Sequence, residues 1–177
     1  MEVKGKVVVV TGGAEGIGAG LARRFAREGA KAVIVADRNG EGAAAVAKEI
    51  GGEAVTLDVS DGAAVAAMVT DIEARHGGID LFCSNAGVGD GDPDKQSAAS
   101  SPDAVWNRAW NVNVMAHVHA ARAVIPGMQA RGGGYLLNTI SAAGLLSQIG
   151  GAVYSTTKHA AVGFAESLAI THGDQGV

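Results

Sequence analysis

The eight residues Thr11-Gly12-Gly13-Ala14-Glu15-Gly16-Ile17-Gly18 join an apolar, β-branched run to a stretch of helical period. Gly12 permits a sharp turn, Gly16 lets a ligand approach the backbone, and Gly18 lets the helix lie close to the sheet. Backbone amides at the positive end of a helix can hold a pyrophosphate. The turn therefore predicts a dinucleotide site, with a purely structural turn in a chain of 27 glycines as the alternative.

Apolar runs alternate with alanine-rich stretches of helical period along the rest of the chain. This alternation is typical of repeated strand–helix units and a parallel sheet. The predicted strands are residues 6–11, 31–36, 54–57, 79–84 and 134–139. The predicted helices are residues 17–28, 41–50, 62–76, 103–127 and 155–171. We expect a Rossmann-like, doubly wound α/β fold in a single dinucleotide-binding domain, residues 1–177, with no metal.

Local signals set several helix ends. Gly29 is a predicted left-handed cap, and Asp61 is a predicted N-cap. The hydroxyl of Ser101 is predicted to cap the helix that begins at residue 103, and Pro126 is expected to end or kink that helix. His117 and His119 would lie on different faces of it without a third ligand, so we expect packing or surface positions for them and not a metal site.

Charge and cysteine content exclude several classes of partner. Eighteen acidic and 14 basic residues give a net charge of −4, which argues against attraction to nucleic acid or an anionic membrane. The single cysteine, Cys83, excludes an intrachain disulfide and favours a reducing compartment. The apolar run at residues 7–10 is too short for a signal-peptide core or a membrane span. We expect a soluble cytoplasmic protein.

Asp37 closes the second predicted strand, nineteen residues after Gly18. A carboxylate at this place can accept hydrogen bonds from the ribose hydroxyls of an adenosine, although an exposed strand-end aspartate is the simpler alternative. Asp37 would repel a 2′-phosphate, and Glu15 adds a second negative charge at the turn. NAD is therefore expected over NADP, with Arg38 as the residue that could pair with a 2′-phosphate and reverse the preference.

Tyr154 and Lys158 lie four residues apart, so both can occupy one side of a helix. A phenol has a reference pKa of about 10, and a nearby ammonium stabilises its charged form, so the pair can carry a proton near neutral pH. Ser141 follows the fifth predicted strand, and its hydroxyl could orient a carbonyl at the sheet edge where ligands bind. The alternatives are an ordinary surface pair and a turn-forming serine.

These motifs resemble those of the short-chain dehydrogenase/reductase family. Residues 11–18 are similar to its T-G-x-x-x-G-x-G turn, and residues 154–158 to its Y-x-x-x-K motif. Asp58-Val59 resembles its adenine-contacting pair, and Ser84-Asn85-Ala86-Gly87 resembles its N-N-A-G segment with serine in place of the first asparagine. The order and spacing of the motifs also match across essentially the whole chain.

The resemblance implies hydride transfer between NAD and the alcohol or carbonyl carbon of a small, apolar substrate. Tyr154 would be the general acid/base, Lys158 would lower its pKa and bind the nicotinamide ribose, and Ser141 would bond the substrate oxygen. Asn113 falls where the family places an asparagine that holds a proton-relay water, with Asn111 as the competing candidate. The expected catalytic residues are Asn113, Ser141, Tyr154 and Lys158. The expected cofactor-binding residues are Gly12, Glu15, Gly16, Ile17, Gly18, Asp37, Arg38, Asp58, Val59, Asn85, Ala86, Gly87, Tyr154 and Lys158.

Family members continue beyond the length of this chain, so we expect a domain that is incomplete at its C-terminus and marginally stable alone. Residues 134–139 would then form an exposed edge strand. The resemblance also implies a homodimer or homotetramer through residues 105–125 and 155–170. The alternatives are a catalytically silent dinucleotide-binding or interaction module, and an enzyme of this fold that uses bound NAD for epimerisation or dehydration. An apolar pocket is expected around Ala143, Leu145, Leu146 and Gly151.

Overall fold

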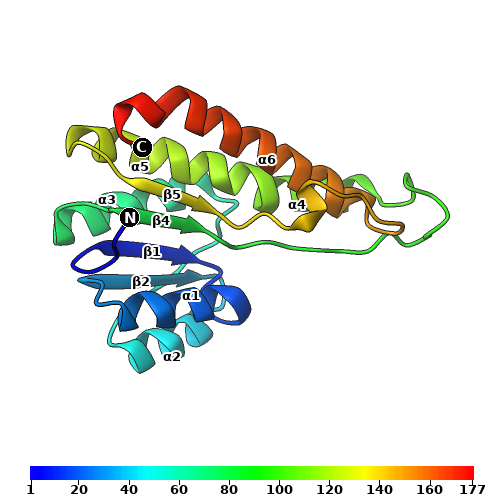
Figure 1. Ribbon diagram of the computed structural model, residues 1–177. Coiled ribbons are helices and arrows are strands. Elements are labelled where there is room, and N and C mark those ends of the chain that lie inside the picture. Colours follow the sequence, from blue (N-terminus) through cyan, green and yellow to red (C-terminus); the bar gives the residue numbers. More distant parts are fainter.

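The computed structural model describes residues 1–177 as a five-stranded parallel sheet with helices on both faces (Figure 1). In sheet order the strands are β3 (Glu53–Thr56), β2 (Ala32–Asp37), β1 (Val7–Thr11), β4 (Leu81–Ser84) and β5 (Tyr135–Asn138). The α-helices are α1 (Gly16–Arg27), α2 (Gly40–Ile50), α3 (Gly62–His76), α4 (Asp103–Trp110), α5 (Ala116–Ala130) and α6 (Ala152–His172). The predicted Rossmann-like α/β fold is confirmed, and every predicted strand end lies within two residues of its place in the structure.

The four valines of β1 divide between the two faces of the sheet. Val7 and Val9 pack with α3 and α5, whereas Val8 and Val10 pack with α1 and α2. Successive strand residues point to opposite faces, so a continuous apolar run buries both faces of a parallel sheet. β1 therefore joins two hydrophobic layers and lies at the centre of the fold.

The direction of winding reverses at β1, because β2 flanks it on one side and β4 on the other. In open parallel sheets such a reversal opens a crevice at the carboxyl ends of the strands. Thr11, Asp37 and Ser84 are the last residues of β1, β2 and β4, and they lie along this edge. β5 pairs only with β4 and forms the sheet edge that the sequence predicts.

The predicted ends of the first three helices are confirmed. Gly29, with φ of 79°, follows α1 in the left-handed conformation. The carboxylate of Asp61 caps α3 by accepting hydrogen bonds from the amides of Ala63 and Ala64 at 2.9 and 3.0 Å. None of the helices is long and apolar enough to cross a bilayer.

The single long helix predicted from residue 103 to 127 is wrong in three respects. Its cap is not Ser101, whose hydroxyl instead donates to the Asp92 carboxylate at 3.1 Å. A π-helical turn, Asn111–Met115, separates α4 from α5. Pro126 does not end α5, which continues to Ala130, because buried apolar side chains before and after the proline hold this helix against the sheet.

Candidate active site

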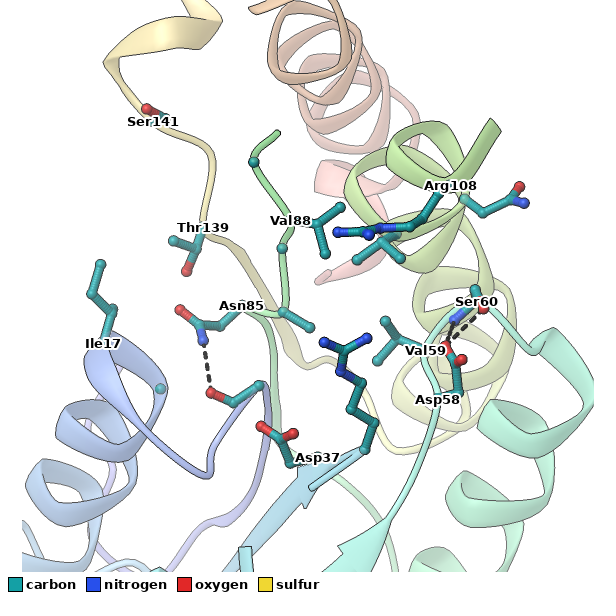
Figure 2. Close-up of a pocket in the computed structure, with 18 of the residues that line it drawn as sticks. Ile17, Asp37, Asp58, Val59, Ser60, Asn85, Val88, Arg108, Thr139 and Ser141 are labelled. Atoms are coloured by element: carbon teal, nitrogen blue, oxygen red, sulfur yellow. Dashed lines mark hydrogen bonds between the residues drawn. The ribbon is translucent and has the colours of Figure 1, made fainter. Parts of the chain in front are cut away.

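A cleft of about 840 Å³ runs across the carboxyl ends of the strands (Figure 2). The structure brings nearly all predicted site residues into it: Gly12, Glu15, Ile17, Gly18, Asp37, Arg38, Asp58, Val59, Asn85, Ala86, Gly87, Ser141, Tyr154 and Lys158. Asn111 also lines the cleft, and the residues that the sequence did not single out are Leu57, Ser60, Val88, Gly89, Arg108, Val112, Thr139 and Ile140. Four of these eight residues adjoin a predicted residue in the same strand-end loop, and that position is the signal that could have found them: Leu57, Ser60, Val88 and Ile140.

The glycines of the first turn are required for two different reasons. A Cβ at Gly12 would lie 2.8 Å from the Ala86 Cα, and one at Gly18 would overlap the Gly12 carbonyl oxygen. Gly16 has open space around it, and its φ of 54° is what favours glycine there. Gly16 does not line the cleft, to which the turn contributes Gly12, Glu15, Ile17 and Gly18.

Thr11 and Asn85 tie this turn to the loop after β4. The Thr11 hydroxyl accepts hydrogen bonds from the amides of Asn85 and Ala86 at 3.0 and 3.2 Å. The Asn85 side-chain amide donates to the carbonyls of Thr11 and Gly12 at 3.0 and 3.3 Å. The two loops that flank the switch point are therefore fixed to each other before any ligand arrives.

Asp37 stands at the end of the cleft opposite Ser141 (Figure 2). Its carboxylate accepts hydrogen bonds from the amides of Ala14 at 3.1 Å and Asn39 at 2.9 Å. A carboxylate has about four lone-pair sites, so two acceptor positions remain for a ligand.

Asp58 lies near the same end, where its carboxylate accepts bonds from the Ser60 hydroxyl at 2.7 Å and the Ser60 amide at 2.9 Å. These bonds, with a smaller contribution from the Arg38 charge, hold the pKa of Asp58 below its ordinary value. Asp58 is therefore an ionised acceptor at neutral pH, beside a guanidinium.

Lys158 is a buried cation, 3% exposed, next to Tyr154 on α6. Its ammonium donates to the Thr139 carbonyl at 3.2 Å and lies 5.7 Å from the centre of the Tyr154 ring. Burial lowers the pKa of Lys158 from its ordinary value. The predicted helical pair therefore does share one side of α6, and the end of β5 anchors its lysine.

Ser141 lies two residues beyond Thr139 and lines the cleft. Its φ of 151° is the only positive value at a residue other than glycine, and its hydroxyl accepts a hydrogen bond from the Ala143 amide at 3.2 Å. The hydroxyl hydrogen remains free to bond an incoming oxygen. Leu145 and Leu146, predicted to line an apolar pocket, do not line this cleft and are 76% and 67% exposed.

Asn113 is fully buried in the π-helical turn and does not line the cleft. Its side-chain oxygen accepts from the Val88 amide at 2.9 Å, and its side-chain nitrogen donates to the Val88 carbonyl at 2.8 Å and the Thr157 hydroxyl at 3.0 Å. Both N–H groups are thus used within the protein. The side chain fixes the segment after Gly87 to α6, and its expected role with a relay water stays a prediction.

Two other titratable groups, His117 and Cys83, are packed in the interior. His117 lies 3.0 Å from the Asn138 side-chain oxygen, and burial, followed by the Lys158 charge, lowers its pKa to about 4. Burial raises the pKa of the Cys83 thiol to about 12. His119 lies 3.3 Å from the Val59 carbonyl oxygen.

The strand order and the glycine turn at its switch point define a Rossmann-like α/β protein. The short chain dehydrogenase family model matches residues 6–177. The chain is 34% identical to 3beta-hydroxysteroid dehydrogenase 2 of Eggerthella lenta, over 98% of this chain and 67% of that protein. It is 40% identical to momilactone A synthase of Oryza sativa subsp. japonica, over 98% of this chain and 63% of that protein. The chain belongs to the short chain dehydrogenase family.

A solved structure supports the same assignment. The structure of a 7 alpha-hydroxysteroid dehydrogenase complexed with NADH and 7-oxo glycochenodeoxycholic acid superposes with a TM-score of 0.90 and 30% sequence identity. The match covers 99% of this chain and 68% of that one. The chain thus spans about two thirds, or slightly less, of the length of these relatives.

Proposed function

We propose that this protein is an NAD-dependent oxidoreductase that transfers a hydride between the nicotinamide and the alcohol or carbonyl carbon of a small, apolar substrate. The observation that carries the proposal is the buried Lys158 ammonium, held by the Thr139 carbonyl beside the Tyr154 ring, in the same cleft as the glycine turn. The Tyr154–Lys158 pair can donate and accept a proton in one part of the cleft, and the other parts of the cleft suit a dinucleotide.

Each chemical role follows from an atom at the site. The Tyr154 hydroxyl would give a proton to the substrate oxygen during reduction and take it back during oxidation. Lys158 would stabilise the charged phenolate and bond the nicotinamide ribose, while the free hydrogen of Ser141 would orient the substrate oxygen. The bound cofactor supplies or accepts the hydride.

The charges at the Asp37 end of the cleft, where the adenosine of the cofactor would bind, support NAD over NADP. Asp37 retains two acceptor positions that suit ribose hydroxyls, and the same carboxylate repels a 2′-phosphate. Arg38, the residue that could attract that phosphate, is close enough to Asp58 to affect its pKa. The 7 alpha-hydroxysteroid dehydrogenase of similar structure is complexed with NADH. Hydroxysteroids and other polycyclic secondary alcohols are the first substrates to test, since relatives bear such names.

We further propose a single domain, a cytoplasmic location and a homodimer or homotetramer. The catalytically silent module is less well supported, because the Tyr154–Lys158 pair and the glycine turn that lines the same cleft are both intact.

The test is a cofactor titration followed by a matched pair of tyrosine variants. NADH should bind saturably and more tightly than NADPH, as followed by nicotinamide fluorescence. Tyr154→Phe should lower kcat by about 10²–10⁴-fold while leaving the Kd for NADH nearly unchanged. Tyr135→Phe is the control, because Tyr135 is exposed on β5 and outside the cleft. Near wild-type turnover by Tyr154→Phe would overturn the proposal.

A further inference from the structure

Asp92 is a buried carboxylate that the proposed chemistry does not use. It is 7% exposed, lies in the loop between β4 and α4, and does not line the cleft. A buried carboxylate is costly unless hydrogen bonds or an opposite charge offset the loss of water. Asp92 takes part in none of the ion pairs of the structure, so its partners must be dipoles.

Those partners lie at the start of α6. One Asp92 oxygen accepts from the Ala152 amide at 2.9 Å, and the other accepts from the Ser101 hydroxyl at 3.1 Å. The Asp92 amide also donates to the Gly150 carbonyl at 3.0 Å. Ala152 is the first residue of α6, and the preceding Gly151 has no side chain with which to cap it. Asp92 therefore supplies the missing cap from sixty residues away, at the positive end of the helix.

The same loop makes further contacts with this end of α6 (Figure 1). A Cβ at Gly89 would lie 3.3 Å from the Tyr154 ring, so the loop backbone passes close to that ring. A Cβ at Gly150 would lie 3.0 Å from Lys95 Cγ, so the lysine stem covers the turn before the helix. Tyr154 is two residues after the capped amide. The loop thus contacts the start of α6 both at the capped Ala152 amide and at the Tyr154 ring, which lines the cleft.

We propose that Asp92 is a positioning residue that fixes the first turn of α6 and thereby sets where the Tyr154 hydroxyl lies in the cleft. Only the consequence for catalysis rests on the proposed function. The contacts by which Asp92 and its loop hold the start of α6, called the clamp below, are a property of the fold. Loss of the carboxylate frees the Ala152 amide and the Ser101 hydroxyl, while the backbone bond from Asp92 to the Gly150 carbonyl and the glycine turn at residues 11–18 stay intact. Small displacements of a catalytic group cost up to about 10²-fold in rate.

The experiment compares wild-type protein with Asp92→Ala, Asp92→Asn and Asp94→Asn, all in the full chain. Asp94 is the matched control, because it is an exposed carboxylate of the same loop that accepts only the Gln96 amide. Hydrogen–deuterium exchange of residues 152–158 should quicken at least about tenfold in Asp92→Ala. The value of kcat should fall about 10- to 100-fold, with little change in KM or in NADH binding. The exchange rate and kcat of Asp92→Asn should lie between those of the wild type and those of Asp92→Ala, since the asparagine amide keeps one acceptor oxygen.

Exchange separates this inference from the proposed function, because it needs no turnover. Faster exchange at residues 152–158 in Asp92→Ala, but not in Asp94→Asn, supports the clamp even if no alcohol or ketone is turned over, and only the proposed function then fails. Exchange like that of the wild type in both Asp92 variants overturns the clamp. A fall in kcat without faster exchange overturns it as well. If Asp92→Ala does not fold, the same readouts on Asp92→Asn decide.

Discussion

His117 makes the free energy of unfolding depend on pH in a defined window. The ring is 2% exposed, and burial, with a smaller contribution from Lys158, lowers its pKa from 6.5 to about 4. Below pH 6.5 the unfolded chain binds a proton at this residue, whereas the folded chain does so only near pH 4. The contribution of His117 to the free energy of unfolding is therefore fully present above pH 6.5 and is lost as the pH falls toward 4. The difference between the two pKa values corresponds to about 3 kcal/mol, most of which is lost by pH 4.5.

Urea unfolding of the wild type and of His117→Gln, from pH 7.5 to pH 4.5, measures this effect. The variant is less stable than the wild type at pH 7.5, but the difference in the free energy of unfolding between the two proteins should narrow by about 2–3 kcal/mol at pH 4.5, because glutamine does not titrate. Val124→Ala is the control, since Val124 is fully buried on the same helix and carries no titratable group. The free energy of unfolding of Val124→Ala should be lower than that of the wild type by the same amount at every pH. Parallel curves for the wild type and His117→Gln would refute the reasoning.

Three further perturbations test other parts of the structure. Gly18→Ala should abolish NADH binding and lower the melting temperature, because its Cβ would overlap the Gly12 carbonyl oxygen; unchanged titration and melting curves would contradict this. Cys83 should resist a thiol reagent at pH 8 until urea unfolds the protein, since it is buried and its pKa is about 12; rapid labelling of the folded chain would count against that burial. Asp61→Ala should cost about 1 kcal/mol in urea unfolding through the loss of two capping bonds, and no measurable change would show that water replaces them.

The parts of the fold that sequence reasoning located correctly rest on local signals. The valines of β1 form an apolar run that only a strand buried on both faces accommodates, and Gly29 follows a helix where a positive φ is needed. Asp37 and Ser141 were located correctly because each comes at or just after the end of a strand. The carboxyl ends of parallel strands share one edge of the sheet, so both residues lie in the cleft.

The parts that it missed depend on contacts between distant residues. Ser101 has the residue type and position of a cap, yet its hydroxyl bonds Asp92, and Asp92 in turn caps a helix sixty residues away. Pro126 has the signature of a helix end, but packing of the helix against the sheet outweighs the lost hydrogen bond. The side chain of Asn113 joins Val88 to Thr157, which the Trp110–Asn113 segment alone does not indicate. No local pattern in the sequence encodes these pairings.

The π-helical turn at Asn111–Met115 also has a consequence for how this helical segment tolerates changes in length. A π turn contains one residue more than the α-helical turn it replaces. Because the π turn completes one revolution with the extra residue, removing one residue there would leave a continuous α-helix whose two ends keep nearly the same rotation about the helix axis. Arg108 would then stay in the cleft while α5 kept its packing against the sheet. The π turn therefore absorbs one residue without changing the rotational phase between α5, which supports the fold, and α4, which contributes Arg108 to the cleft.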